Sequence, residues 1–402
     1  MSSKPEAVIT RVRASNFRSI ESLDLQFDPL NVLVGQNGAG KSNIIDVLRF
    51  VRDCINRSVD QALLDRGGMS AVRRLSPRSP GADVAIELEC TVGRIAVEYG
   101  FSLGSDGRSE YLVREEHLRT RDTATGYRSL DIRLNCGRWA EKESGTLMLQ
   151  DSYSEFDLHL PKGWMLHSGM TKHADVVAIV DATRLFTEMS FYNISPESLR
   201  PPQQIVAESP FDEKGRNLAA VLRRLRKGNG PELNDIEGAL ARLVDGLRTY
   251  EIHNVGSYLI TKLLYEFPNA VSEDATRLGS DLAHESDGTL RILSILAALY
   301  QQPSRPLVVI EEPETNIHPG ALGVIADLLK EASLRSQILV TTHNPDLIEH
   351  FAPDMLRVVE KSDGVTHAGP VAHDQQEAIR KMLFSTAEIM KMEGLRRETA
   401  GV

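Results

Sequence analysis

Eight residues near the N-terminus, Gly35 to Ser42, have the types and the spacing that bind the phosphates of a nucleotide. They read Gly-Gln-Asn-Gly-Ala-Gly-Lys-Ser, which is the pattern GxxxxGK[ST]. Glycines let successive backbone N–H groups point at phosphate oxygens, the lysine reaches the β- and γ-phosphates, and the serine hydroxyl suits Mg²⁺. The predicted phosphate-binding residues are Gly35, Asn37, Gly38, Gly40, Lys41, Ser42 and Asn43.

The residues on either side of this loop favour the same interpretation. An apolar run, residues 31–34, precedes the loop, and a helical pattern of apolar residues follows it from Ile44 to Val51. A strand, a glycine-rich loop and a helix place the first helical turn at the phosphates, where its unpaired N–H groups favour an anion. The alternative is a glycine-rich turn without a ligand, which the complete motif in this context disfavours.

Two carboxylates and a histidine follow two other apolar runs. Residues 307–310 are all apolar β-formers, typical of a strand buried on both faces of a mostly parallel sheet, and Glu311 and Glu312 follow them. A second such run, residues 337–342, ends at His343. Hydrolysis of a phosphate needs a metal ligand and a base for water. Glu311 fits the Mg²⁺ ligand, Glu312 the base, and His343 a contact to the γ-phosphate and the water.

The rest of the chain predicts the elements that position these groups. Strands are expected at 8–14 and 23–27, and a hairpin that turns at Gly93-Arg94 is expected between 84 and 101. Further strands are predicted at 111–118, 129–135, 146–150 and 356–360, and helices at 217–227, 232–248, 322–332 and beyond Ser286.

Composition excludes several classes of protein. The formal net charge of −10 disfavours a general polyanion binder. No apolar run is long enough for a membrane span, and the first residues lack the apolar core of a signal peptide, so we expect a cytoplasmic protein without membrane contact. The cysteines, Cys54, Cys90 and Cys136, lack metal spacing and are expected to be reduced and buried. The same reasoning makes His117, His159, His167 and His173 surface or packing residues rather than metal ligands.

Two basic clusters leave an alternative open. Arg73, Arg74 and Arg78 lie in or beside a loop, and the helix ending near Gly228 carries four cations. A charged surface loop and cations that suit a helix C-terminus account for both. A nucleic-acid contact, by Arg73, Arg74, Arg78, Arg223, Arg224, Arg226 and Lys227, is the alternative.

The order and spacing of these motifs resemble the ABC-type ATPase heads of the RecF and SMC kind. The resemblance is strongest to compact bacterial RecF-like AAA ATPases (OLD-type and RecF-like) that lack a coiled coil. It covers residues 8–60 and 280–362, and no long heptad pattern is present. The matching segments are Asn16–Ile20, the GQNGAGKS loop, ESDGTLR (the signature segment, residues 285–291), IEEPETNIHP and VTTHNPDL.

The resemblance implies an α/β fold of the P-loop NTPase class, an ABC ATPase head with a central mostly parallel sheet, an antiparallel β layer and an inserted helical lobe. It implies lobes at 1–185, 186–300 and 301–402 that form one composite ATPase domain binding ATP and Mg²⁺. It also adds Arg18 to the ATP-binding residues. Ser286 and Gly288 would contact the γ-phosphate bound by a second copy, with Asn316 at the seam of the homodimer.

Some features depart from the family pattern. The strand ends in Glu311-Glu312 where Asp-Glu is usual, and the signature segment reads Ser-Asp-Gly-Thr rather than Ser-Gly-Gly-Gln. A Q-loop glutamine is not assigned. The 244 positions from Ser42 to Ser286 hold β layers and short helices instead of a coiled coil. Only 59 positions follow His343, which is too few for the TOPRIM domain of OLD-type nucleases.

Two functions fit these features, since fold alone does not settle function. In the first, ATP binding closes two heads and hydrolysis releases them, which gates a partner effector in bacterial anti-phage defence or a stress response. In the second, a RecF-like ATPase binds DNA during repair. A subunit of a membrane transporter is disfavoured, because the signature segment is not of that branch.

Overall fold

The computed structural model describes residues 7–76, 81–105, 111–126, 128–135, 173–205, 209–228, 230–266 and 277–398. The predicted strand at 146–150 and the residues Arg78, Cys136, His159 and His167 lie outside these ranges. Cys54 and Cys90 are free and buried, as expected.

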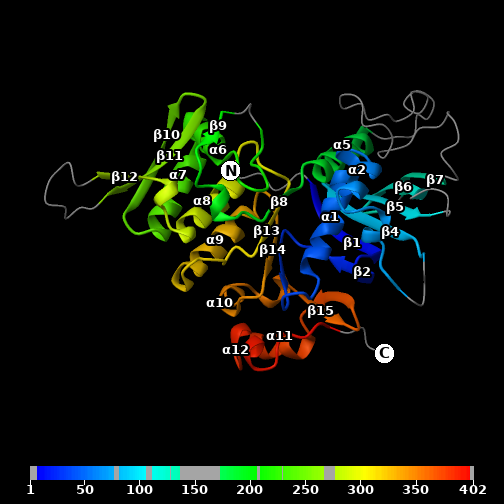
Figure 1. Cartoon of the computed structure of the whole chain (residues 1–402). Helices are drawn as coiled ribbons and strands as arrows, with labels where there is room; N and C mark the ends of the chain where they lie inside the picture. Colours follow the sequence, from blue (N-terminus) through cyan, green and yellow to red (C-terminus); the bar gives the residue numbers. More distant parts are fainter. Residues whose placement is uncertain are drawn as a thin grey trace.

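A six-stranded sheet in the middle of the molecule carries the ends of the predicted motifs (Figure 1). Strands β15, β3, β14, β13 and β8 are parallel neighbours, and β16 is antiparallel at one edge. Parallel strands covered on both faces read as continuous apolar runs, which is why β3, β13 and β14 were predictable. The strands are β3 (Leu30–Val34), β8 (Ser190–Tyr192), β13 (Leu307–Glu311), β14 (Gln337–Thr342), β15 (Leu356–Ser362) and β16 (Val365–Pro370).

An antiparallel sheet of six strands forms the predicted β layer. Its order is β2-β1-β4-β5-β6-β7, so every pair except β1/β4 joins strands that are consecutive in the sequence. Alternation of buried and partly buried residues along β4 gives it one face on the core and one more open face. The strands are β1 (Ala7–Phe17), β2 (Ile20–Gln26), β4 (Val84–Val92), β5 (Ile95–Gly104), β6 (Leu112–Asp122) and β7 (Arg128–Asn135).

The lobe between residues 186 and 300 contains a third sheet that was not predicted. The sequence analysis expects helices there, and the structure adds the antiparallel strands β10, β11 and β12, with β9 paired to β11. The predicted helix 232–248 was too long at its C-terminal end: α7 stops at Leu243, because Val244 is extended and Gly246 has a φ of 74°. The strands are β9 (Gln203–Gln204), β10 (Leu247–Val255), β11 (Tyr258–Glu266) and β12 (Arg277–Asp281).

Helices cover both faces of the central sheet. Figure 1 shows α1, α2 and α5 beside the antiparallel sheet and α6 and α7 beside β10–β12, with α11 and α12 at the C-terminal end. The longer helices are α1 (Lys41–Asn56), α5 (His173–Thr187), α6 (Leu218–Gly228), α7 (Pro231–Leu243), α8 (Asp287–Tyr300) and α9 (Leu322–Ala332). The shorter ones are α2 (Val59–Leu64), α3 (Met69–Val72), α10 (Pro345–Ile348), α11 (His373–Arg380) and α12 (Thr386–Met392).

The apolar core divides along the central sheet, and β3 shows how. Leu33 packs into a cluster with α1, α5 and the antiparallel sheet, whereas Val32 and Val34 pack into a second cluster with α6 to α9. Neighbouring residues of a strand point to opposite faces, so one strand contributes to both clusters. The phosphate-binding loop thus begins at the end of a strand that is held from both sides.

Candidate functional site

The phosphate-binding loop connects β3 to α1 in the conformation that its glycines permit. Gly40 has a φ of 108°, a region that side chains rarely adopt. A Cβ at this residue would stand 2.0 Å from Oγ1 of Thr366 in β16. Both facts restrict the residue before Lys41 to glycine, the residue type that phosphate-binding loops use where the backbone approaches another group closely.

Lys41 lies inside the loop. It is 7% exposed, and its Nζ donates to the carbonyl oxygens of Gly35 at 2.7 Å and Gln36 at 3.2 Å. Burial lowers the pKa of the amine, and the charges of Glu312 and Glu314 act in the opposite direction. The side chain is therefore fixed at the mouth of the loop, where it can bind a phosphate if it releases these carbonyls.

The two predicted metal ligands lie in contact. Ser42 Oγ donates to Glu311 Oε2 at 3.2 Å, and Arg49 Nη2 lies 3.5 Å from Glu311 Oε1. The parallel register of β3, β14 and β13 produces this contact, because it brings the carboxyl ends of the three strands to one edge. A hydroxyl beside a carboxylate at a phosphate-binding loop is a donor set that fits Mg²⁺.

Glu312 leaves the strand in an unusual backbone conformation. Its φ is 47°, which costs a residue with a side chain of the order of 1 kcal/mol or more. Its N–H donates to the carbonyl of Thr341 at 3.0 Å, and its carboxylate Oε1 lies 3.3 Å from Nδ1 of His343. The base predicted from the sequence and the predicted histidine are therefore neighbours, as expected for residues that directly follow β13 and β14.

Arg291 is a residue of this site that the sequence analysis missed. It is 5% exposed, and its Nη2 donates to the carbonyls of Glu311 at 2.6 Å and Glu312 at 2.7 Å. Its Nη1 donates to the carbonyl of Ile194 at 2.5 Å. Burial lowers the pKa of the guanidinium. Since Arg291 belongs to helix α8, it links the signature segment to the strained turn at Glu312.

These groups surround a cleft of about 640 Å³. The sequence analysis predicted its loop side and its carboxylates but not the wall formed after β8 by residues 193–196. Strand β8 has three residues, which is too short a pattern to recognise in the sequence. Its pairing with β13 places Asn193, the next residue, beside Glu311. The cleft is lined by Asn37, Gly38, Gly40, Lys41, Ser42, Asn43, Asn193, Ile194, Ser195, Pro196, Arg291, Glu311, Glu312, Thr315, Asn316 and Thr341.

Two predicted ATP-binding residues have partners within the protein. Arg18 Nε lies 2.7 Å from Oδ2 of Asp46 on α1, and the arginine does not line the cleft. Asn43 lines the cleft, and its Nδ2 donates to Ser19 Oγ at 2.5 Å. The segment before the loop is thus attached to the first two turns of α1, and a contact of Arg18 with ATP stays a prediction.

The signature segment lies outside this cleft. Ser286 is exposed and caps α8, accepting the N–H of Thr289 at 3.1 Å. Gly288 lies against the loop after β13, where a Cβ would stand 2.6 Å from the carbonyl oxygen of Asn316. Neither Ser286 nor Gly288 lines the cleft of its own chain.

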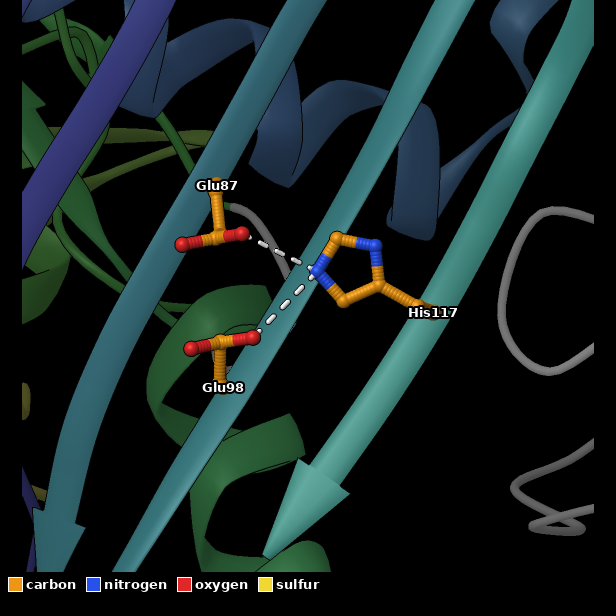
Figure 2. Close-up of side chains that lie close together, drawn as sticks. All are labelled: Glu87, Glu98 and His117. Carbon is orange, nitrogen blue, oxygen red and sulfur yellow. Dashed lines mark hydrogen bonds and ion pairs between the residues drawn. The ribbon is translucent and has the colours of Figure 1, made fainter. Parts of the chain in front are cut away.

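The register of the antiparallel sheet brings His117 to two carboxylates that are distant in the sequence. Its Nε2 lies 3.1 Å from Glu87 Oε2 and 3.6 Å from Glu98 Oε1, and Figure 2 shows the ring pointing toward both carboxylates. The ring fits because it crosses Gly100, where a Cβ would stand 2.7 Å from Cε1. The three ligand atoms are close enough for a metal site, so the sequence argument that no second ligand is available to His117 was incomplete.

Arginines balance the charge of this cluster. Arg13 forms ion pairs with both Glu87 and Glu98, and Arg119 forms one with Glu98. A cation placed between these carboxylates would meet two guanidinium groups that already neutralise them. The cluster therefore resembles a charged network on the outer face of the sheet more than a metal centre.

Most of the described basic residues of the two clusters have partners in the chain. Arg74 pairs with Glu21 at 3.2 Å, and Arg73 contacts Ser105. On α6, Arg224 donates to the carbonyl of Ser209, and Arg226 donates to the carbonyl of Tyr250 and lies over its ring. These contacts fit the structural explanation of both clusters, and a nucleic-acid contact stays a prediction.

The chain belongs to the family described as "AAA domain, putative AbiEii toxin, Type IV TA system", whose model matches residues 30–146 and 190–349. Its sequence is similar to OLD and RecF proteins, and its fold is similar to that of SMC heads. The Old nuclease of Escherichia phage P2 is 22% identical over 386 residues, which are 89% of this chain and 60% of that protein.

Other relatives match over shorter stretches. RecF of Porphyromonas gingivalis, a DNA replication and repair protein, is 33% identical over 91 residues, 22% of this chain and 25% of RecF. The Rad50 ATPase of Thermoplasma volcanium, a DNA double-strand break repair protein, is 50% identical over 44 residues, 11% of this chain and 5% of Rad50. This chain therefore spans less than two thirds of the length of each of these three relatives.

Solved structures confirm the predicted fold. An SMC head bound to the C-terminal winged-helix domain of ScpA superposes with a TM-score of 0.54 and 15% identity, covering 91% of this chain and 99% of the head. An SMC head from Pyrococcus furiosus, bound to the C-terminal domain of ScpA, gives 0.52 and 13%, covering 94% and 99%. The architecture is that of a P-loop NTPase head. Among the described residues, no helix is both long and apolar enough to cross a membrane.

Proposed function

We propose that this chain binds ATP with Mg²⁺ in the cleft and hydrolyses it to ADP and phosphate. The contact that carries the proposal is the one between Ser42 Oγ and Glu311 Oε2, 3.2 Å long, at the start of α1. It joins a phosphate-binding loop to the carboxyl end of a neighbouring strand, which is where open α/β sheets bind their ligands. Glu312 and His343 lie at the same edge.

Each residue then has a separate task. The amides of the loop and Lys41 bind the phosphates, and Ser42 and Glu311 hold the metal. The bound Mg²⁺ supplies positive charge to the phosphate oxygens. Glu312 orients and deprotonates the attacking water, and His343 donates to the γ-phosphate. Lys41 exchanges its bonds to the carbonyls of Gly35 and Gln36 for bonds to phosphate oxygens.

We further propose that two copies close face to face around two ATP molecules. Ser286 and Gly288 lie outside the cleft of their own chain, and Ser286 is exposed, so both can reach a phosphate bound by a second copy. Asn316, which contacts Gly288 and lines the cleft, would lie at the seam. Such an interface is isologous, and it depends on the γ-phosphate, which makes it a switch.

The switch would gate a partner effector in anti-phage defence or a stress response. The family description and the extended match to a phage nuclease support this role. ATP-dependent DNA binding in repair is the second candidate, and the matches to RecF and Rad50 favour it.

The test of hydrolysis compares ATP turnover with Mg²⁺ and with excess chelator. We expect turnover to require Mg²⁺ and Lys41→Ala to abolish it, since the variant removes the cation at the phosphates. Lys381→Ala is the matched control, because Lys381 is exposed and pairs only with Glu377 among the contacts described. Equal turnover in Lys41→Ala and wild type would refute the assignment of the loop.

A mobility assay with duplex DNA, with and without ATP, separates the two roles. Salt-sensitive binding that Arg223→Ala/Arg224→Ala/Arg226→Ala removes would favour repair. No binding, together with co-purification of a protein encoded beside this chain, would favour the gated effector.

A further inference from the structure

Glu314 is a buried carboxylate beside the site to which the roles above give no task. Its side chain is 4% exposed, and its Oε1 accepts a hydrogen bond from the hydroxyl of Thr342 at 2.5 Å. Its Oε2 has no hydrogen-bond partner among the residues that the structure describes. Burying a carboxylate with one unpaired oxygen costs free energy. Stability therefore does not explain the presence of Glu314, and a task in the site would.

The imidazole of His343 lies between two carboxylates. Its Nδ1 is 3.3 Å from Oε1 of Glu312 and 3.9 Å from Oε1 of Glu314. One nitrogen carries one proton, so Nδ1–H can donate a full hydrogen bond to only one of these oxygens at a time. In this structure Glu312 is the nearer, and a bond from His343 withdraws charge from the oxygen that has to accept a proton from water. Hydrolysis requires Glu312 to be released from the ring.

We infer that Glu314 is a positioning residue for His343: it accepts the Nδ1 proton of the ring when Glu312 turns to the attacking water. The inference rests on the proposed ATPase function and adds a residue to the same site. No covalent bond changes in this step, since the proton stays on Nδ1 and only its acceptor changes. With Nδ1–H held by Glu314, the proposed donation from His343 to the γ-phosphate falls to the other ring nitrogen, Nε2, which carries its own proton when the ring is an imidazolium.

Thr342 fixes the place of this second acceptor. Its hydroxyl accepts the N–H of Asn344 at 3.0 Å while it donates to Glu314. The pair of bonds ties the turn after β14, which carries His343, to the turn after β13, which carries Glu312. Because both turns are held together, a small rotation of the ring is enough to exchange one carboxylate for the other.

The test uses Glu314→Gln, which keeps the shape and the oxygen that accepts from Thr342 but removes the charge. We expect kcat to fall about tenfold with KM for ATP unchanged, since the change affects the orientation of a catalytic group and not the phosphate contacts. The acidic limb of kcat against pH should move to lower pH, because removal of a negative charge lowers the pKa of neighbouring groups. Combined with His343→Ala, Glu314→Gln should cause no further loss.

Glu116→Gln is the matched control. Glu116 is buried in β6 and does not line the cleft, and like Glu314 it accepts a hydrogen bond from a hydroxyl, that of Tyr99 at 3.0 Å. It should leave kcat, KM and the pH profile unchanged, and thermal unfolding shows whether each variant is folded.

Three outcomes would overturn the role of Glu314: a kcat equal to that of wild type, a loss that adds fully to that of His343→Ala, or a loss of kcat with an unchanged pH profile. Absence of hydrolysis in the wild-type chain would instead refute the proposed function, so the two failures can be told apart. If Glu314→Gln does not fold, Glu314→Asp is used in its place. Aspartate keeps the charge but is shorter, so a kcat equal to that of wild type would also contradict positioning.

Discussion

The carbonyl oxygen of Asn316 lies 2.6 Å from the point where a Cβ on Gly288 would stand. The signature segment and the loop after β13 are therefore packed at backbone distance within one chain. In the proposed dimer the same two residues face the second copy. Gly288 belongs to the surface that would bind the phosphate of that copy, and Asn316 lies at the edge of the chain's own cleft, so the contact joins the two surfaces.

This contact predicts the effect of Gly288→Ala. The added methyl group pushes Asn316 away, so we expect ATP-dependent dimerisation to be lost while ATP still binds to the loop of the monomer. Light scattering measures the first quantity and fluorescence of a labelled nucleotide the second. Gly238→Ala on α7 is the matched control, because a Cβ there meets no atom within 4 Å. A Gly288→Ala chain that dimerises like wild type would contradict the proposed interface.

Glu312→Gln should trap the closed dimer. The amide keeps the size of the side chain but cannot take a proton from water, so kcat should fall about 10²-fold or more. ATP then stays bound, and light scattering should give twice the monomer mass with ATP and the monomer mass with ADP. A chain that is loaded with ATP and strictly monomeric would rule out the two-headed arrangement.

Arg291→Ala should weaken both the fold and the site. The variant removes the guanidinium donor from the carbonyls of Glu311 and Glu312, although Glu312 still accepts the N–H of Thr315. We expect the free energy of unfolding in urea to fall by about 2–4 kcal/mol. Arg291→Lys should not restore it, because an ammonium group cannot reproduce the fork that also reaches Ile194. Arg216→Ala, which removes an exposed guanidinium from an i,i+4 pair with Asp212, is expected to cost much less. Equal costs for both alanine variants would contradict the clamp.

The raised pKa of Glu314 predicts a pH dependence of stability. Burial is the main cause, and the charge of Glu312 adds to it. The folded chain therefore binds this proton more tightly than the unfolded chain, so the ionised carboxylate lowers stability as pH rises through the folded pKa. Relative to wild type, Glu314→Gln should gain in melting temperature as pH rises above the ordinary glutamate pKa of 4.5. A difference that stays constant with pH would contradict the raised pKa of this carboxylate.

The elements around the nucleotide were predictable because each has its own local signal. The loop carries a motif of fixed spacing, and β13 and β14 are buried on both faces, so each contains an unbroken apolar run, Leu307–Ile310 and Ile338–Val340. The contact of Ser42 with Glu311, 269 positions apart, followed from one rule, that the carboxyl ends of parallel strands meet.

Other parts could not be predicted from local patterns. The sheet of β10–β12 was missed because a helical pattern continues into Leu247, and the positive φ of Gly246 that ends it has no unique sequence signal. Arg291 and Glu314 gained their importance from partners outside their own elements, Ile194 and Thr342. An isolated arginine or glutamate beside a motif is usually a surface residue, so only the packed structure identifies them.

The pairing of β3 with β14 has a consequence for synthesis of the chain. Val34, the last residue before the loop, lies beside Thr342, so the strand that starts the site and the strand that completes it are translated about three hundred residues apart. During most of translation, β3 lacks the neighbour that gives the loop its second wall. We expect a truncated chain that ends before β14 to expose an unpaired apolar strand, and such a nascent product would need a chaperone or be degraded.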